Sequence, residues 1–97
     1  MKTITVQQLK ERLAQGESLT LIDVREPEEV AQGMIPGAVH IPLGEIPDRF
    51  AEIPKDRETI MICRSGNRSS RAIEFLQHHG YDNLVNMTGG MLAWEQI

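Results

Sequence analysis

Cys63, the only cysteine in the chain, lies in a short basic loop whose residue types suit nucleophilic chemistry. It follows the apolar run 59–62 and precedes a segment, 70–76, with the apolar spacing of a helix. This order predicts a strand, a tight loop and a helix, with the cysteine at the carboxyl end of the strand, where open parallel sheets bind ligands. Between residues 59 and 73 there are three arginines and no acidic residue, although the chain has a formal net charge of -4. The positive charge is therefore local to the cysteine.

The chemistry that this loop suits is attack by a thiolate. An ordinary thiol pKa of about 8.5 leaves only a few per cent of the group ionised at neutral pH. A helix N-terminus, free loop N–H groups and nearby arginines all favour the thiolate, and Gly66 lets the backbone close into a cradle. Free cysteines are often simply buried, so the hypothesis of a reactive Cys63 depends on all these features occurring together.

Length and composition restrict the class of protein. The 97 residues predict one domain, 1–97, and the acidic balance argues against generic binding of nucleic acid. A lone cysteine cannot form an intramolecular disulfide, and it excludes metal sites built on clustered cysteines. No apolar stretch has the length of a secretory signal or a membrane span. We therefore expect a cytoplasmic protein with no bound metal, no membrane and no nucleic acid.

Short β-rich runs alternate with helical patterns along the whole chain. The expected strands are 3–4, 19–24, 38–41, 59–62 and 84–87. The expected helices are 6–15, a short one after Glu26, one or two turns within 43–50, one from the loop to Gly80, and 91–94. This alternation predicts an α/β fold with a central, mostly parallel five-stranded sheet and helices on both faces.

Asp23 and Arg25 stand at the end of a predicted strand and are supporting candidates for the site. We expect Arg25 to pair with Asp23 or with Glu29 and to hold the loop that borders the site, while a contribution to the pocket floor stays open. His40 falls inside a predicted strand and is expected to be a structural residue. No histidine is placed by the sequence as a base for Cys63.

The loop from Cys63 to Arg68 resembles the six-residue active-site loop of the single-domain rhodaneses, a family of sulfurtransferases. Four further segments are similar to recurring segments of that family and come in the same order: 21–26, 35–38, 41–43 and 89–94. The resemblance implies a rhodanese-like fold and no cofactor. It also implies a two-step exchange, in which Cys63 takes the outer sulfur of thiosulfate or a similar anionic donor as a persulfide. An acceptor, either cyanide, a thiol or a protein cysteine, then removes that sulfur.

The resemblance also implies roles for the loop. The residues that would bind substrate are Arg64, Ser65, Gly66, Asn67, Arg68 and Ser69. Their backbone N–H groups would cradle the persulfide, while the two arginines would attract the anionic donor and stabilise the leaving sulfite. Arg64 favours thiosulfate over mercaptopyruvate as the donor, and we expect the protein to be a monomer.

Two other classes of function compete with sulfur transfer. Phosphatases and arsenate reductases of this kind of fold place five residues between the cysteine and an arginine, whereas four separate Cys63 from Arg68, and Ser69 stands where the arginine is needed. A loop of this length suits a sulfur atom better than a phosphate. The second alternative is a binding or regulatory module without turnover, against which the presence of Cys63 and both loop arginines argues.

Overall fold

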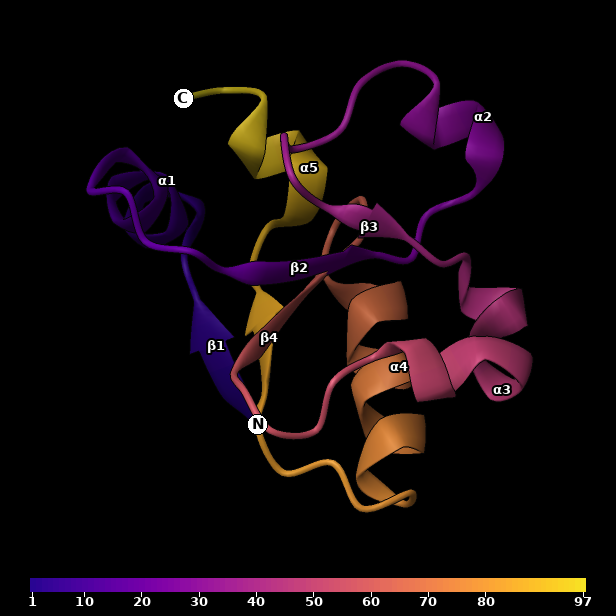
Figure 1. Ribbon diagram of the computed structural model, residues 1–97. Helices are drawn as coiled ribbons and strands as arrows, with labels where there is room; N and C mark the ends of the chain where they lie inside the picture. Colours follow the sequence, from indigo (N-terminus) through magenta and orange to yellow (C-terminus); the bar gives the residue numbers. More distant parts are fainter.

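The computed structural model describes all 97 residues and is built on one five-stranded sheet (Figure 1). The strands are β1 (Lys2–Ile4), β2 (Thr20–Asp23), β3 (Val39–His40), β4 (Thr59–Ile62) and β5 (Leu84–Met87). They lie in the order β1-β5-β4-β2-β3, and every neighbouring pair is parallel. The expected α/β fold is confirmed, and the sheet is wholly parallel.

Helices cover both faces of this sheet. The longer ones are α1 (Val6–Ala14) and α4 (Asn67–Gln77), and the short ones are α2 (Pro27–Val30), α3 (Ile46–Arg49) and α5 (Gly90–Trp94). Two 3-10 turns, η1 (Leu43–Glu45) and η2 (Phe50–Glu52), flank α3. In Figure 1 α1 and α5 lie on one side of the sheet, and α3 and α4 on the other. None of these helices has both the length and the apolar character needed to cross a membrane.

The alternation of side chains along the strands divides the core between the two faces. Leu21 and Ile60 belong to the buried cluster that packs with α1 and α5. Their neighbours Ile22 and Met61 belong to the cluster that packs with α3 and α4. Cys63 continues the second set, so its side chain lies on the face that α4 covers.

The local signals predicted the elements well and their ends less well. Thr5 and Gln8 form the expected capping box at the start of α1, with hydrogen bonds of 2.9 and 3.1 Å between each backbone N–H and the other's side chain. The strands predicted over 19–24 and 38–41 are shorter, at Thr20–Asp23 and Val39–His40. The strand order places β4 between β5 and β2, so residues from both neighbours border the end of β4, where Cys63 lies.

Candidate active site

The Cys63 loop closes at Gly66, where the backbone takes the left-handed conformation with a φ of 107°. This turn sends the N–H of Gly66 back to the Cys63 Sγ at 3.0 Å, and α4 begins at the next residue. Glycine adopts such a φ without the steric cost that a Cβ brings. The predicted strand, loop and helix are confirmed, and the Cys63 side chain is fully buried beneath the loop.

Two opposing effects act on the Cys63 thiol. Burial raises its pKa, while hydrogen bonds from the Ser69 side chain and from the N–H groups of Ser69, Gly66 and Ser65 lower it. The hydrogen bonds outweigh burial, so the pKa lies below its ordinary value. The loop therefore favours the nucleophilic thiolate through neutral donors aimed at the sulfur.

A buried polar network supports the sulfur from α4 and β5. The Ser69 Oγ lies 3.3 Å from the Cys63 Sγ and 2.5 Å from the Asn86 Oδ1. The Asn86 amide in turn donates to the Gly66 carbonyl at 3.1 Å. Asn86 is a nearly buried residue of the neighbouring strand β5, so the network joins the loop to the sheet.

The N-terminus of α5 holds the carbonyl groups of the loop on the opposite side. The Met91 N–H donates to the Cys63 carbonyl at 2.9 Å, and the Leu92 N–H donates to the Arg64 carbonyl at 3.0 Å. Gly90 makes this contact possible, because a Cβ on it would lie 2.3 Å from both the carbonyl carbon and the carbonyl oxygen of Arg64. With these two carbonyls bound by α5, the loop turns N–H groups toward the sulfur.

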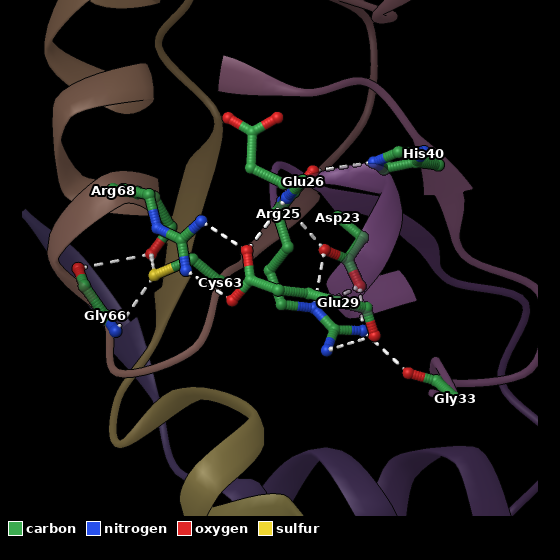
Figure 2. A network of polar contacts seen from close by, with 10 residues as sticks. Asp23, Arg25, Glu26, Glu29, Gly33, His40, Cys63, Gly66 and Arg68 are labelled. Carbon is green, nitrogen blue, oxygen red and sulfur yellow. Dashed lines mark hydrogen bonds and ion pairs between the residues drawn. The ribbon is translucent and has the colours of Figure 1, made fainter. Parts of the chain in front are cut away.

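Arg68 is tied to α2 by an ion pair. Its guanidinium donates to both carboxylate oxygens of Glu29, at 2.6 and 2.8 Å (Figure 2). The Arg68 pair lowers the pKa of Glu29 to about 2, and Glu29 raises that of Arg68. The predicted role of Arg68 in attracting a donor stays a prediction, and it requires the donor to share Arg68 with Glu29.

Asp23 and Arg25 form a second, buried ion pair beside the first. Arg25 Nη2 lies 2.9 Å from Asp23 Oδ2 and also donates to the Gly33 carbonyl at 2.8 Å, which holds the segment after α2 (Figure 2). Of the two expected partners the structure selects Asp23, and the Glu29 carboxylate goes to Arg68 instead. His40 Nε2 lies 2.6 Å from the Arg25 carbonyl oxygen, consistent with a structural role.

The remaining loop side chains, of Arg64, Ser65 and Asn67, are exposed. Arg64 makes no ion pair, and it borders a hollow of about 140 Å³ between the segment after α2 and α5. The other residues lining this hollow are Arg25, Glu29, Gln32, Gly33, Met91, Leu92 and Glu95. A larger hollow of about 590 Å³ lies between β1 and α1, is lined by side chains of both charges, and contains no residue of the loop.

Sequence reasoning missed the part that Asn86 plays. The available signal was a polar residue inside the otherwise apolar strand Leu84–Met87, because a buried amide needs partners. The sequence alone indicates Glu29 only as a partner for Arg25, and Gly90 only as part of a recurring segment. No group of three or more His, Cys, Asp or Glu side chains is arranged to hold a metal ion.

Comparison with known proteins agrees with this geometry. Residues 5–97 match the model of the rhodanese-like domain family. The chain belongs to this family. It is 50% identical over 95 residues to YtwF of Bacillus subtilis, an alignment that covers 98% of this chain and 91% of YtwF. It is 47% identical over 91 residues to a protein of Allochromatium vinosum named sulfurtransferase, and that alignment covers 94% of this chain and 85% of the relative.

Solved rhodanese structures have the same fold. A rhodanese-like domain protein from Staphylococcus aureus superposes with a TM-score of 0.91 at 40% identity, covering 97% of this chain and 91% of that one. A human single-domain sulfurtransferase superposes with a TM-score of 0.81 at 30% identity, covering 99% and 96%. Family and relatives together support sulfur transfer as the general class of activity.

Proposed function

We propose that this protein moves a sulfane sulfur from thiosulfate, or a similar anionic donor, to a thiophilic acceptor through a persulfide on Cys63. The observation that carries the proposal is the hydrogen-bonded sulfur at the end of β4, with the Gly66 N–H 3.0 Å from Sγ and a lowered thiol pKa. Covalent catalysis of this kind divides one transfer into two displacements.

In the first displacement the Cys63 thiolate attacks the outer sulfur of the donor. A new S–S bond forms, the S–S bond of thiosulfate breaks, and sulfite leaves with the bonding electron pair. The loop N–H groups that now surround the thiolate stabilise the negative outer sulfur of the persulfide. Arg64, exposed and free of any ion pair, is the loop cation best able to meet the anionic donor.

In the second displacement an acceptor nucleophile attacks the outer sulfur, and the Cys63 thiolate leaves. The acceptor is cyanide, a small thiol or the cysteine of a partner protein. Neither step changes the total number of electrons, so donor and acceptor need no further oxidant or reductant. The arrangement also argues against the alternative of a phosphatase, because Arg68 is held by Glu29 and is not free to clamp a phosphate.

Mass spectrometry of the intact, reduced protein after treatment with thiosulfate tests the proposal. We expect a gain of one sulfur atom that maps to Cys63 and is lost on addition of cyanide. The matched variant Cys63→Ser keeps the shape of the side chain, should remain folded and should gain nothing. Absence of the gain in folded, reduced protein would contradict the proposal and favour a binding module without turnover.

A further inference from the structure

The Ser69 hydroxyl has more acceptors than it can serve. Its Oγ lies 2.5 Å from the Asn86 Oδ1, 3.2 Å from the Gly66 carbonyl oxygen and 3.3 Å from the Cys63 Sγ. A hydroxyl has one proton and two lone pairs, so it donates to one well-aligned partner at a time. The three contacts therefore compete for the same proton.

The orientation of the Asn86 amide decides that competition in favour of Asn86. Its Nδ2 donates to the Gly66 carbonyl at 3.1 Å, and a carbonyl only accepts. The amide oxygen must therefore face Ser69, and because that oxygen has no proton, the 2.5 Å contact requires Ser69 to be the donor. In this arrangement Ser69 presents its lone pairs to the sulfur, which suits a thiol S–H; the Ser69 hydrogen bond that lowers the thiol pKa requires the hydroxyl to turn away from Asn86.

We propose that Asn86 is a positioning residue that competes with the Cys63 sulfur for the Ser69 proton, so that the network has two arrangements. In the first, the Cys63 thiol donates to Ser69, and Ser69 donates to Asn86. In the second, the thiol proton has passed to solvent, the hydroxyl has turned about its Cβ–Oγ bond to donate to the thiolate, and the Asn86 oxygen has lost its donor. Asn86 therefore opposes thiolate formation, while the loop N–H groups favour it.

This competition gives the network a part in sulfur transfer, and that part rests on the proposed function. Once a sulfur is bound, the inner sulfur of the persulfide is no longer an anion. The Ser69 hydroxyl therefore turns again to donate its hydrogen bond to the Asn86 oxygen. The negative outer sulfur then depends on the loop N–H groups alone. When the acceptor removes it, the hydroxyl turns back to stabilise the departing Cys63 thiolate.

Charged groups around the sulfur set a background that the Asn86 variants leave in place. Arg68 of α4 interacts electrostatically with Cys63 and is paired with Glu29 of α2. Asp23 and Arg25, after β2, are paired with each other. Glu26, before α2, also interacts electrostatically with Arg68, and Arg64 of the loop is exposed. Farther out, Glu45 of η1 is paired with Arg49, and Arg71 of α4 is exposed. Neither β5 nor α5 contributes a charged side chain.

The test is the pH profile of Cys63 alkylation by iodoacetamide, which needs no sulfur donor. Asn86→Leu removes the competing acceptor, and we expect it to lower the pH midpoint by about one unit. Ser69→Ala removes the donor and should raise the midpoint. The shift caused by Asn86→Leu should largely disappear when Ser69 is alanine, because Asn86 does not contact the sulfur and reaches it through the hydroxyl. Any small shift that remains reports the lost hydrogen bond to the Gly66 carbonyl.

Asn83→Leu is the matched control. Asn83 lies just before β5, its side chain makes no hydrogen bond, and its substitution should leave the midpoint unchanged. If Asn86→Leu does not fold, Asn86→Asp takes its place. A carboxylate accepts the Ser69 proton more strongly than the amide oxygen does, so we expect the pH midpoint to rise. The rise should be smaller when Ser69 is alanine, because only the added negative charge then acts on the thiolate. A shift from Asn86→Leu that is upward, or equal with and without the Ser69 hydroxyl, would overturn the proposal. Failure of thiosulfate to form a persulfide would instead count against the proposed function. The alkylation midpoints would still test the competition between Asn86 and Cys63, because alkylation needs no sulfur donor.

Discussion

The two sides of the Cys63 loop are built from different interactions. On the side of β5 and α5 every contact is neutral: the Asn86 amide, the Ser69 hydroxyl and the backbone N–H groups of α5. On the side of β2 and α2 the contacts are ionic, with Asp23 paired to Arg25, and Glu29 paired to Arg68. The neutral side acts on the sulfur and on the backbone around it, whereas the ionic side holds the segments that border the loop.

This difference between the two sides determines which loop arginine is available to bind an anionic donor. Arg68 is neutralised by Glu29, so the positive charge available to an anion is smaller than the residue count suggests. Burial and neutral hydrogen bonds are the main influences on the pKa of Cys63, although Arg68 also interacts electrostatically with the sulfur. Arg64 is the one arginine of the 63–69 loop that remains free to meet a donor.

The largest effect on stability is expected from breaking the buried ion pair. Arg25→Met leaves the fully buried Asp23 carboxylate without its partner, and we expect a loss of about 3 to 5 kcal/mol in the free energy of unfolding. Urea denaturation measures it. Arg71→Met, at an exposed arginine of α4 without an ion pair, is the control and should change stability by less than about 0.5 kcal/mol. An equally small loss for Arg25→Met would mean that the ionic side does not hold the fold.

A substitution on the neutral side should reduce the rate of persulfide formation strongly while costing less stability than Arg25→Met. Gly90 has a φ of 57°, and a Cβ there would lie 2.3 Å from the Arg64 carbonyl, so Gly90→Ala must displace the loop. We expect a loss of roughly 2 to 4 kcal/mol in stability and about 100-fold or more in the rate of persulfide formation by the folded protein. Gly44→Ala is the control, because its φ is not positive and nothing lies within 4 Å of the added Cβ. Full activity of Gly90→Ala would contradict the view that α5 shapes the loop.

The sequence predicted those parts of this site that depend on neighbouring residues. An apolar run, a glycine and a helical pattern were enough to predict β4, the loop and α4, since each signal is local. The partners of the loop could not be predicted in the same way. Glu29 is 39 residues from Arg68, and Asn86 is 17 residues from Ser69, so only the order of the strands brings them together.

Freeing Arg68 should show how far Glu29 limits the binding of an anionic donor. In Glu29→Gln the guanidinium no longer faces a carboxylate, and we expect the KM for thiosulfate to fall roughly fivefold, which corresponds to about 1 kcal/mol. Steady-state kinetics measure it. Glu28→Gln, at the exposed neighbouring carboxylate of α2, is the matched control and should leave KM unchanged. A higher KM in Glu29→Gln would mean that Arg68 binds the donor only while Glu29 holds it in place.

The smallest effect is the dependence of stability on pH that the same pair introduces. The Arg68 pair lowers the pKa of Glu29 from 4.5 to about 2, so the folded state holds the carboxylate ionised where the unfolded state takes up a proton. The stabilisation is therefore complete above the unfolded pKa and is lost as pH falls from about 4.5 toward 2. Because 26% of the Glu29 side chain is exposed, we expect about 1 kcal/mol. The difference in unfolding free energy between the unsubstituted protein and Glu29→Gln should thus be present at about pH 6 and close near pH 2. A difference that persists to the acid limit would show that Arg68 holds the neutral carboxyl as firmly as the carboxylate, and the contact would then not be ionic in its energetics.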